Sequence, residues 1–254
     1  MIGFLKNEFK KIIKLKMIQV LFFLIMLIQI LFIRANIGYS LFTGYELTIG
    51  KLISTQLLCL LYFNIILFVV ISVYIFEGDK VWRTNSFYRS LITDKRQLIT
   101  KIISMALIHI AIIIFIVFFT SVIGYLHPLI NNNFSTQLIL MQILTICFST
   151  MILSIGGTVL ASLSSNVVIG IIPIIALPLF ETGVYDYVGN VKFILPFWNV
   201  QNILVEMFKN LDAQAFWSLE KITKMNALFS FGFLLIMALV SLIVIYHRRK
   251  SYQI

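Results

Sequence analysis

The chain has 254 residues, of which 60% are hydrophobic and 12% are charged, and its formal net charge is +10. Soluble globular domains average about 45–50% apolar and about 25% charged residues, so the composition excludes that class and indicates an integral membrane protein. The basic excess does not indicate nucleic-acid binding, because the cations flank long apolar runs and do not alternate with aromatic residues along a groove. Cys59 and Cys147 both lie inside apolar runs, which predicts neither a disulfide framework nor a metal site.

Residues 1–16 predict a basic amphipathic helix that lies on the inner leaflet. Phe9 and Ile13 share an apolar helical face, and Lys6, Lys10 and Lys14 fall on another face, as in helices that lie in the membrane interface. The alternative is a basic leader that only fixes topology. Residues 17–33 follow as the first expected span, which is retained because it lacks a small-residue cleavage site.

Six transmembrane helices are predicted in all. Residues 102–180 contain no Asp, Glu, Lys or Arg, and at about 20 residues per crossing this stretch holds three helices. Turn-forming residues after 126 and after 161 supply the breaks between them. The expected spans are 17–33, 52–76, 102–126, 137–161, 164–180 and 227–246.

The charges fall on one side of these spans. Fourteen basic and four acidic residues lie in the N-terminal segment, in 77–101 and after 246, and the six basic and six acidic residues elsewhere cancel. The positive-inside rule places the basic segments in the cytoplasm. An even number of spans also returns the C-terminus to the side of the N-terminus, so we expect a multi-pass plasma-membrane protein with both termini cytoplasmic.

Two segments between spans are too long to be turns. Residues 77–101 mix charges with Trp82, Phe87 and Tyr88, which favours a short helix across the cytoplasmic face with aromatic side chains available to a partner; a solvated loop that only fixes topology is the alternative. Residues 181–226 are close to neutral, with five acidic and four basic residues, and are rich in apolar residues. They predict an external hairpin that dips into the outer leaflet or caps the helices.

The chain offers no assembled catalytic or nucleotide site. His109 is the one titratable residue of clear membrane depth, and without a carboxylate or a second His it forms neither a metal site nor an acid–base pair. We expect it to make an interhelical hydrogen bond, with a place on a transport path as the alternative. The segment from Gly44 to Lys51 fails as a phosphate-binding loop, because five residues separate Gly44 from Gly50 and Leu52 stands where Ser or Thr is required.

A small hydroxyl residue stands at every fourth position from the middle of the span 137–161 to the residue just after it: Thr150, Ser154, Thr158 and Ser162. Small residues at this spacing allow helix backbones to approach closely. We expect this stripe to serve helix packing; contact with a transported substrate is the alternative.

The order of elements resembles the type V (ABC2-type) permeases of ATP-binding-cassette exporters: an amphipathic N-terminal helix, two spans, a charged cytoplasmic helix, three spans, an apolar external hairpin and a final span. Phe76-Glu77 is similar to the acidic residue that follows the second span in that family. The run from Tyr88 to Leu91 resembles its coupling helix, and Asp94-Lys95-Arg96 with Lys101 its basic approach to the third span. The small Gly-Thr pair that usually follows the Glu is replaced here by Asp79-Lys80-Val81-Trp82, which shifts the expected helix boundaries by a few residues. Leu195-Pro196-Phe197 is similar to the segment after the family's external hairpin.

The resemblance implies a permease subunit that is not itself an enzyme and binds no cofactor. Its expected partners are the lipid bilayer, a second permease copy or paralogue, and two copies of a separate ATPase subunit that holds ATP and Mg. Within the family, the length and the Ile-, Asn- and Lys-rich character resemble Gram-positive peptide exporters, such as those of phenol-soluble modulins and the lantibiotic-immunity permeases, so an amphipathic peptide is the implied substrate. The expected ATPase-coupling residues are Glu77, Arg83, Phe87, Tyr88, Arg89, Asp94, Lys95 and Arg96. The expected residues of a translocation path or gate are His109, Phe197, Trp198 and Trp217.

Two other functions stay open at this stage. In the first, an exporter of the same fold moves a lipid, a glycan or a drug, and Trp198 and Trp217 would stack on the sugar of a glycan. In the second, the chain is a membrane partner or sensor that transports nothing, although the soluble domain expected of such a protein is missing from the sequence. Nucleic acid is not an expected partner.

Overall fold

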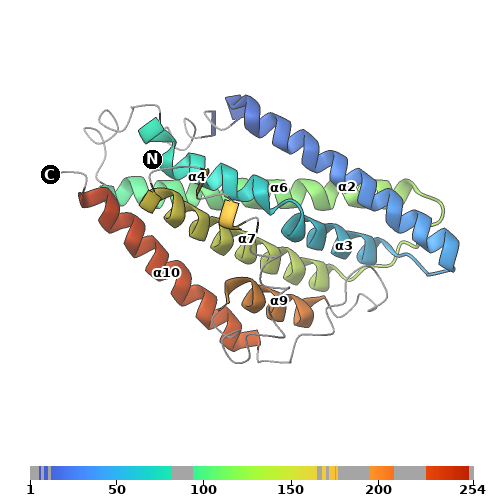
Figure 1. The fold of residues 1–254 in the computed structure, drawn as a ribbon. Helices are drawn as coiled ribbons and strands as arrows, with labels where there is room; N and C mark the ends of the chain where they lie inside the picture. The colour runs from blue at the N-terminus through green and yellow to red at the C-terminus, as the bar shows by residue number, and fades with distance from the viewer. Residues whose placement is uncertain are drawn as a thin grey trace.

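The computed structural model describes residues 6, 9–10, 13–81, 94–164, 168–169, 172–174, 176, 195–208 and 227–251. Within these ranges the regular elements are helices, apart from one isolated β-bridge, which confirms the predicted all-α class. Figure 1 shows them in chain order. They are α2 (Lys16–Thr43), α3 (Ile49–Tyr62), α4 (Ile65–Val81), α6 (Asp94–Leu126), α7 (Thr136–Ser164), α9 (Pro196–Met207) and α10 (Ala227–Ser251).

Four of these helices, α2, α6, α7 and α10, are long and apolar enough to cross a membrane. Together α3 and α4 make a fifth candidate crossing. The described part of the chain therefore supports a protein with four or five membrane-spanning helices; most of the expected span 164–180 lies outside the described residues. The helix α2 extends to Thr43, well beyond the predicted end at residue 33, so Arg34 lies inside the helix.

The predicted span 52–76 is not one straight helix. It breaks at Phe63 and Asn64, and the two halves meet at an angle of 53°. The backbone N–H of Phe63 still donates to the carbonyl of Cys59, while the carbonyl of Asn64 accepts from the N–H of Leu67 in α4. Asn competes for local hydrogen bonds and favours helix ends over helix interiors, which gives the break a local cause.

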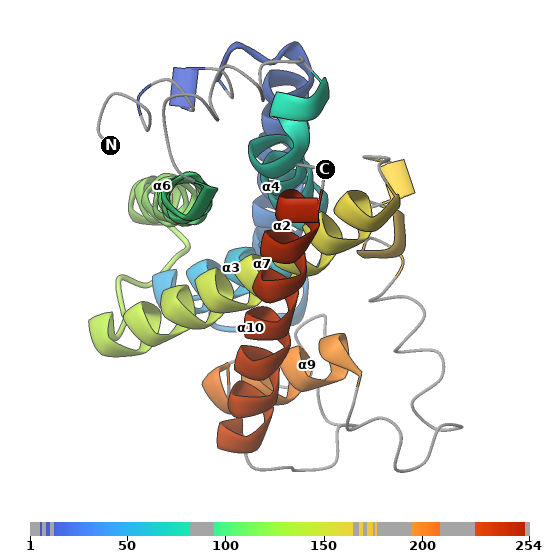
Figure 2. The same cartoon turned by 90° about the vertical axis from the view of Figure 1, so that its left-hand side faces the viewer.

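The helix α7 lies at the centre of the bundle. It packs against α3, α4, α6, α9 and α10, most extensively against α4, and Figure 2 shows it crossing between α4 and α10. Thr150, Ser154, Thr158 and Ser162 are all fully buried. Small side chains on this face let α7 approach its neighbours closely, in agreement with the packing role expected for the stripe.

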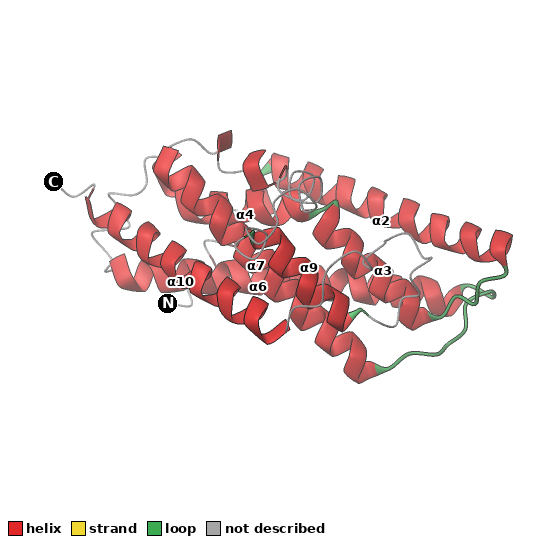
Figure 3. Ribbon diagram, turned by 60° about the horizontal axis from the view of Figure 1, so that its bottom comes forward, coloured by secondary structure: helices red, strands yellow, loops and turns green. Residues whose placement is uncertain are grey.

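The connections at one end of the bundle are joined to each other. Residues 44–48 link α2 to α3, and residues 127–135 link α6 to α7; both are green at the right of Figure 3. The N–H of Ile49 donates to the carbonyl of Asn131, and the N–H of Asn131 donates to the carbonyl of Leu47, each at 3.0 Å. The Asn131 side-chain amide also donates to Glu46 Oε1 at 2.6 Å.

The segments predicted outside the spans are described only in part. The helix α9 belongs to the expected hairpin 181–226, and with 12 residues it is about 18 Å long, too short to cross a bilayer. In the expected coupling segment 77–101, α4 continues to Val81 and α6 begins at Asp94, and residues 82–93 lie outside the described ranges. Of the expected N-terminal helix, the described residues 6, 9–10 and 13–14 are helical.

Candidate functional site

The end of α4 and the beginning of α6 are joined by a buried lysine. The Nζ atom of Lys101 donates a hydrogen bond to the main-chain carbonyl oxygen of Phe76 at 3.1 Å, and the Lys101 side chain is fully buried. Glu77, the residue after Phe76, is only 4% exposed. Burial of an ammonium group costs free energy unless polar partners surround it. The bond to the Phe76 carbonyl therefore holds α6 at this position against α4.

The expected ATPase-coupling residues divide into four groups. Lys95 and Arg96 lie in the first turn of α6 with exposed side chains, where a partner can reach them. Glu77 is buried, so its place suits an anchor within the bundle and not a surface contact. Asp94 is the first residue of α6. The remaining four, Arg83, Phe87, Tyr88 and Arg89, lie outside the described residues.

His109 makes the interhelical hydrogen bond expected of it. Its Nε2 atom lies 3.1 Å from the hydroxyl of Ser72 in α4, and that hydroxyl donates to the carbonyl of Phe68. Ser72 Oγ therefore accepts at its His109 contact, which assigns the proton to Nε2. The ring also packs edge-on against Phe68 at 4.7 Å. His109 is fully buried and joins α6 to α4.

The short helix α9 brings Phe197 and Trp198 into the core. Trp198 is 1% exposed and Phe197 is fully buried. The Phe197 ring meets the ring of Tyr62 edge-on at 5.5 Å, and Gln201 Nε2 donates to the Tyr62 hydroxyl at 3.2 Å. Trp198 thus has no exposed face on which a sugar could stack in this arrangement. Trp217, its expected companion, lies outside the described residues.

Amide and hydroxyl side chains hold α9 against three other helices. Gln142 of α7 accepts from Ser54 of α3 at 2.7 Å and donates to the carbonyl of Met207, at the end of α9, at 3.1 Å. Asn202 donates to the hydroxyl of Ser230 in α10 at 2.9 Å. Interhelical hydrogen bonds of this kind hold membrane helices together where lipid and protein are equally apolar.

Two buried amides, Gln29 in α2 and Gln56 in α3, have a different environment. Both side chains are almost fully buried, and within the described part of the chain neither their oxygen nor their nitrogen has a hydrogen-bond partner. The ring of Phe32, one turn after Gln29, is 5.1 Å from the ring of Phe63, which places Gln29 near the α3–α4 break. A buried amide without a hydrogen-bond partner lowers the stability of the fold. Gln29 and Gln56 therefore mark places in α2 and α3 where a different arrangement of the helices would be more favourable.

The sequence reading missed the polar residues of this interior. Gln29, Gln56, Asn64 and Gln142 each stand within an apolar run. Polar residues at membrane depth usually face the bundle interior, where they mark packing contacts or functional sites. That signal was available in the sequence, although their partners were not.

Within the described residues no three His, Cys, Asp or Glu side chains gather into a potential metal site. Comparison of the chain with protein-family models, with curated proteins and with solved structures finds no match.

Proposed function

We propose that this protein is the permease subunit of an ATP-driven exporter of the type V class, in the plasma membrane with both termini in the cytoplasm, and that it moves amphipathic peptides outward. The observation that carries the proposal is the joint between α4 and α6. The hydrogen bond from Lys101 to the Phe76 carbonyl connects α4 to α6, and the first turn of α6 exposes the cations Lys95 and Arg96. Two helices that are joined beside exposed charge are suited to receive force from a soluble partner.

The bundle offers a route by which such a force reaches its centre. A force on the end of α4 would reach the central helix α7, because α4 packs extensively against it. The break at Phe63 and Asn64 separates α4 from α3, so α4 can tilt while α3 stays in place. The amides of Gln29 and Gln56, which have no hydrogen-bond partner in the described part of the chain, would gain partners in a second arrangement of the helices, which favours a bundle with two states.

Assembly with the ATPase tests the assignment of the partner surface. The chain is co-expressed with the ATPase subunit of its operon, and the Arg89→Ala, Arg96→Ala double variant is compared with Arg34→Ala. Arg34 is an exposed cation within α2 and belongs to neither α4 nor α6. We expect the double variant to lose ATPase co-purification while Arg34→Ala retains it. Unchanged co-purification of the ATPase with the double variant would contradict the assignment of Arg89 and Arg96 to the partner surface.

Stimulation of ATP hydrolysis tests the substrate. The assembled complex is reconstituted in vesicles and exposed to an amphipathic helical peptide, and to a scrambled peptide of equal charge and composition. We expect only the amphipathic peptide to raise the hydrolysis rate. Stimulation by a lipid, a glycan or a drug in place of the peptide would assign the machine to that substrate, and a chain that forms no ATPase complex would be a non-transporting partner protein.

A further inference from the structure

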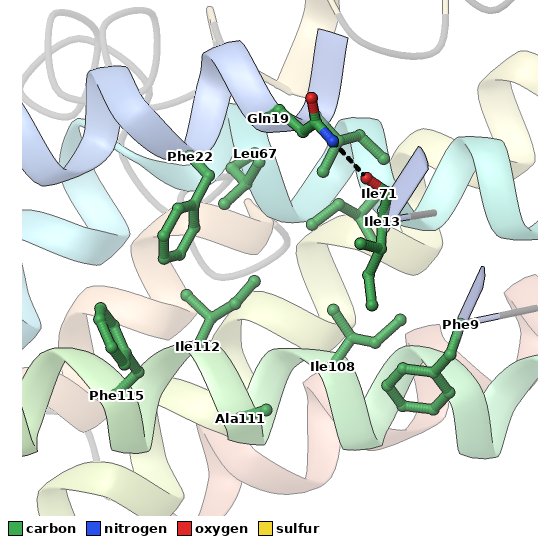
Figure 4. A pocket seen from close by; sticks show the side chains of 11 residues that line it. Phe9, Ile13, Gln19, Phe22, Leu67, Ile71, Ile108, Ala111, Ile112 and Phe115 are labelled. Atoms are coloured by element: carbon green, nitrogen blue, oxygen red, sulfur yellow. Dashed lines mark hydrogen bonds between the residues drawn. The ribbon is translucent and has the colours of Figure 1, made fainter. Parts of the chain in front are cut away.

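A large apolar cavity lies between α2 and α6, away from the α4–α6 joint. Its volume is about 430 Å³, within the range of about 300–1,000 Å³ that is typical of small-molecule sites. Its walls come from α2, α4 and α6 and from Phe9 and Ile13 of the N-terminal segment. Figure 4 shows side chains of both helices pointing into it. The main apolar contributors are Phe22, Leu67, Ile71, Ile108, Ile112 and Phe115.

The cavity is open on one side, and two contacts flank it. Near one end the rings of Phe22 and Phe115 lie with their centroids 5.7 Å apart. Near the other end Ile13 of the N-terminal segment lines the space, and its carbonyl accepts a hydrogen bond from Gln19 Nε2 at 2.8 Å. Gln19 is the one polar side chain of the lining, and this bond uses one of its two N–H donors.

The N-terminal segment presents opposite chemistry on its two sides. Phe9 and Ile13, four residues apart, line the cavity. Lys10 and Lys14, each the next residue along the chain, are exposed, as is Lys16 at the start of α2. The segment therefore gives the cavity apolar lining residues and carries exposed lysines at the adjacent positions.

The position of the cavity matches lipid acyl chains. Its α6 wall, from Ile108 to Phe115, lies inside the charge-free run that begins after Lys101, while the lysines of the N-terminal segment stand where a membrane-surface helix meets headgroups. Water gains nothing in such a cavity, because a bound water needs two or more polar partners. An elongated apolar ligand with an anionic end would fill the apolar space and pair its charge with the neighbouring lysines.

We propose that this cavity binds one acyl chain of an anionic phospholipid, whose phosphate is held at Lys10 and Lys14. The lipid completes the contact between α2 and α6 and holds the N-terminal segment on the bundle. This site is separate from the proposed transport function, and it stands or falls independently of what the protein exports.

Lipid binding by the full chain tests the proposal. The protein is purified in a mild detergent, freed of native lipid, and titrated with phosphatidylglycerol or phosphatidylcholine of identical acyl chains, with bound lipid counted by native mass spectrometry. We expect one tightly bound phosphatidylglycerol and weaker binding of phosphatidylcholine. Equal affinity for the two lipids would overturn the proposal.

Variants locate the site on the molecule. Ala111 lines the cavity from α6 and Ile114 is exposed on the same helix outside the lining. We expect Ala111→Trp, which fills the space, to abolish the tight phosphatidylglycerol site and Ile114→Trp to preserve it. Retention of the tight site in a folded Ala111→Trp protein contradicts the assignment.

The exposed lysines supply a test that does not depend on repacking the interior. Each cation near an anionic lipid contributes about fivefold in affinity, so the Lys10→Gln, Lys14→Gln variant should bind phosphatidylglycerol about twentyfold more weakly. Its binding of phosphatidylcholine should not change. A variant that keeps the full preference for phosphatidylglycerol would show that the phosphate lies elsewhere and overturn the proposal.

Discussion

Lys101 of α6 and Phe76 of α4 are joined by a hydrogen bond from an ammonium group to a main-chain carbonyl, deep enough that the lysine is fully buried. The bond lies near the end of α4 and the beginning of α6. Its loss would separate the two ends of the segment to which we assign contact with the ATPase.

Substitution of Lys101 by Ala should therefore affect both stability and coupling. A hydrogen bond from a charged donor contributes about 1.5–3 kcal/mol, so we expect the free energy of unfolding to fall by about 2 kcal/mol, together with a loss of peptide-stimulated ATP hydrolysis. Lys95→Ala, on the exposed face of the same helix, is the matched control for stability. Thermal unfolding of the purified proteins checks the first effect, and an unchanged midpoint for Lys101→Ala would contradict it.

The Gln142 side chain should contribute through two bonds at once, one with Ser54 and one with the Met207 carbonyl. Hydrogen bonds between membrane helices average about 0.6 kcal/mol each, so Gln142→Leu should destabilise the protein by about 1 kcal/mol. Gln137→Leu, at an exposed position of α7, should have no such effect. Loosening of α9 in the Gln142→Leu protein should appear as faster hydrogen exchange at residues 196–207, and exchange equal to that of Gln137→Leu is the contrary result.

Gly124 of α6 faces Ile49 of α3 across a close contact. A Cβ atom there would lie 3.1 Å from Cγ1 of Ile49, whereas one at Gly38 in α2 would meet nothing within 4 Å. Overpacking costs about 1–3 kcal/mol, so Gly124→Val should lower stability by that amount and Gly38→Val should not. Thermal unfolding of the two variants side by side decides the matter, and equal midpoints would show that α3 and α6 can separate without cost.

His109 and Ser72 should behave as one structural unit. We expect His109→Leu and Ser72→Ala each to destabilise the protein, and the double variant to fall short of the sum by about 0.6 kcal/mol, the usual coupling for such a pair in membrane proteins. Peptide-stimulated ATP hydrolysis should survive His109→Leu, because the imidazole is fully buried between α4 and α6. Loss of stimulation without loss of stability would instead place His109 on the transport path.

The sequence predicted the helical class and the apolar crossings because both depend on composition and run length. Residues 102–126 and 227–246 were expected as spans, and α6 and α10 include them. The bend between α3 and α4 was not predicted. The run 52–76 is mostly apolar, and an average of hydropathy over it does not reveal that Asn64 favours a helix end. The end of α2 was placed too early because Arg34 was taken as the membrane boundary.

The candidate site was predictable to a smaller degree. An interhelical role for His109 follows from the cost of an isolated polar group at membrane depth. The burial of Trp198 did not follow, because an amphipathic run of 12 residues suits the membrane surface as well as a cleft between helices. Partners such as Tyr62 with Gln201 or Gln142 with Met207 lie far apart in the chain, and no local pattern brings them together.

The bond pair between Asn131 and the segment at Leu47 to Ile49 gives α2 and α6 a shared pivot. Since their connections are fastened at that end, the two helices cannot part there without breaking main-chain bonds, and any swing of α2 away from α6 is greatest at their opposite ends. The apolar cavity lies on that wider side, and so do Phe9 and Ile13 of the N-terminal segment that line it. The two helices would therefore part first at the end that bears the lysines, while the end where residues 44–48 and 127–135 are joined stays closed.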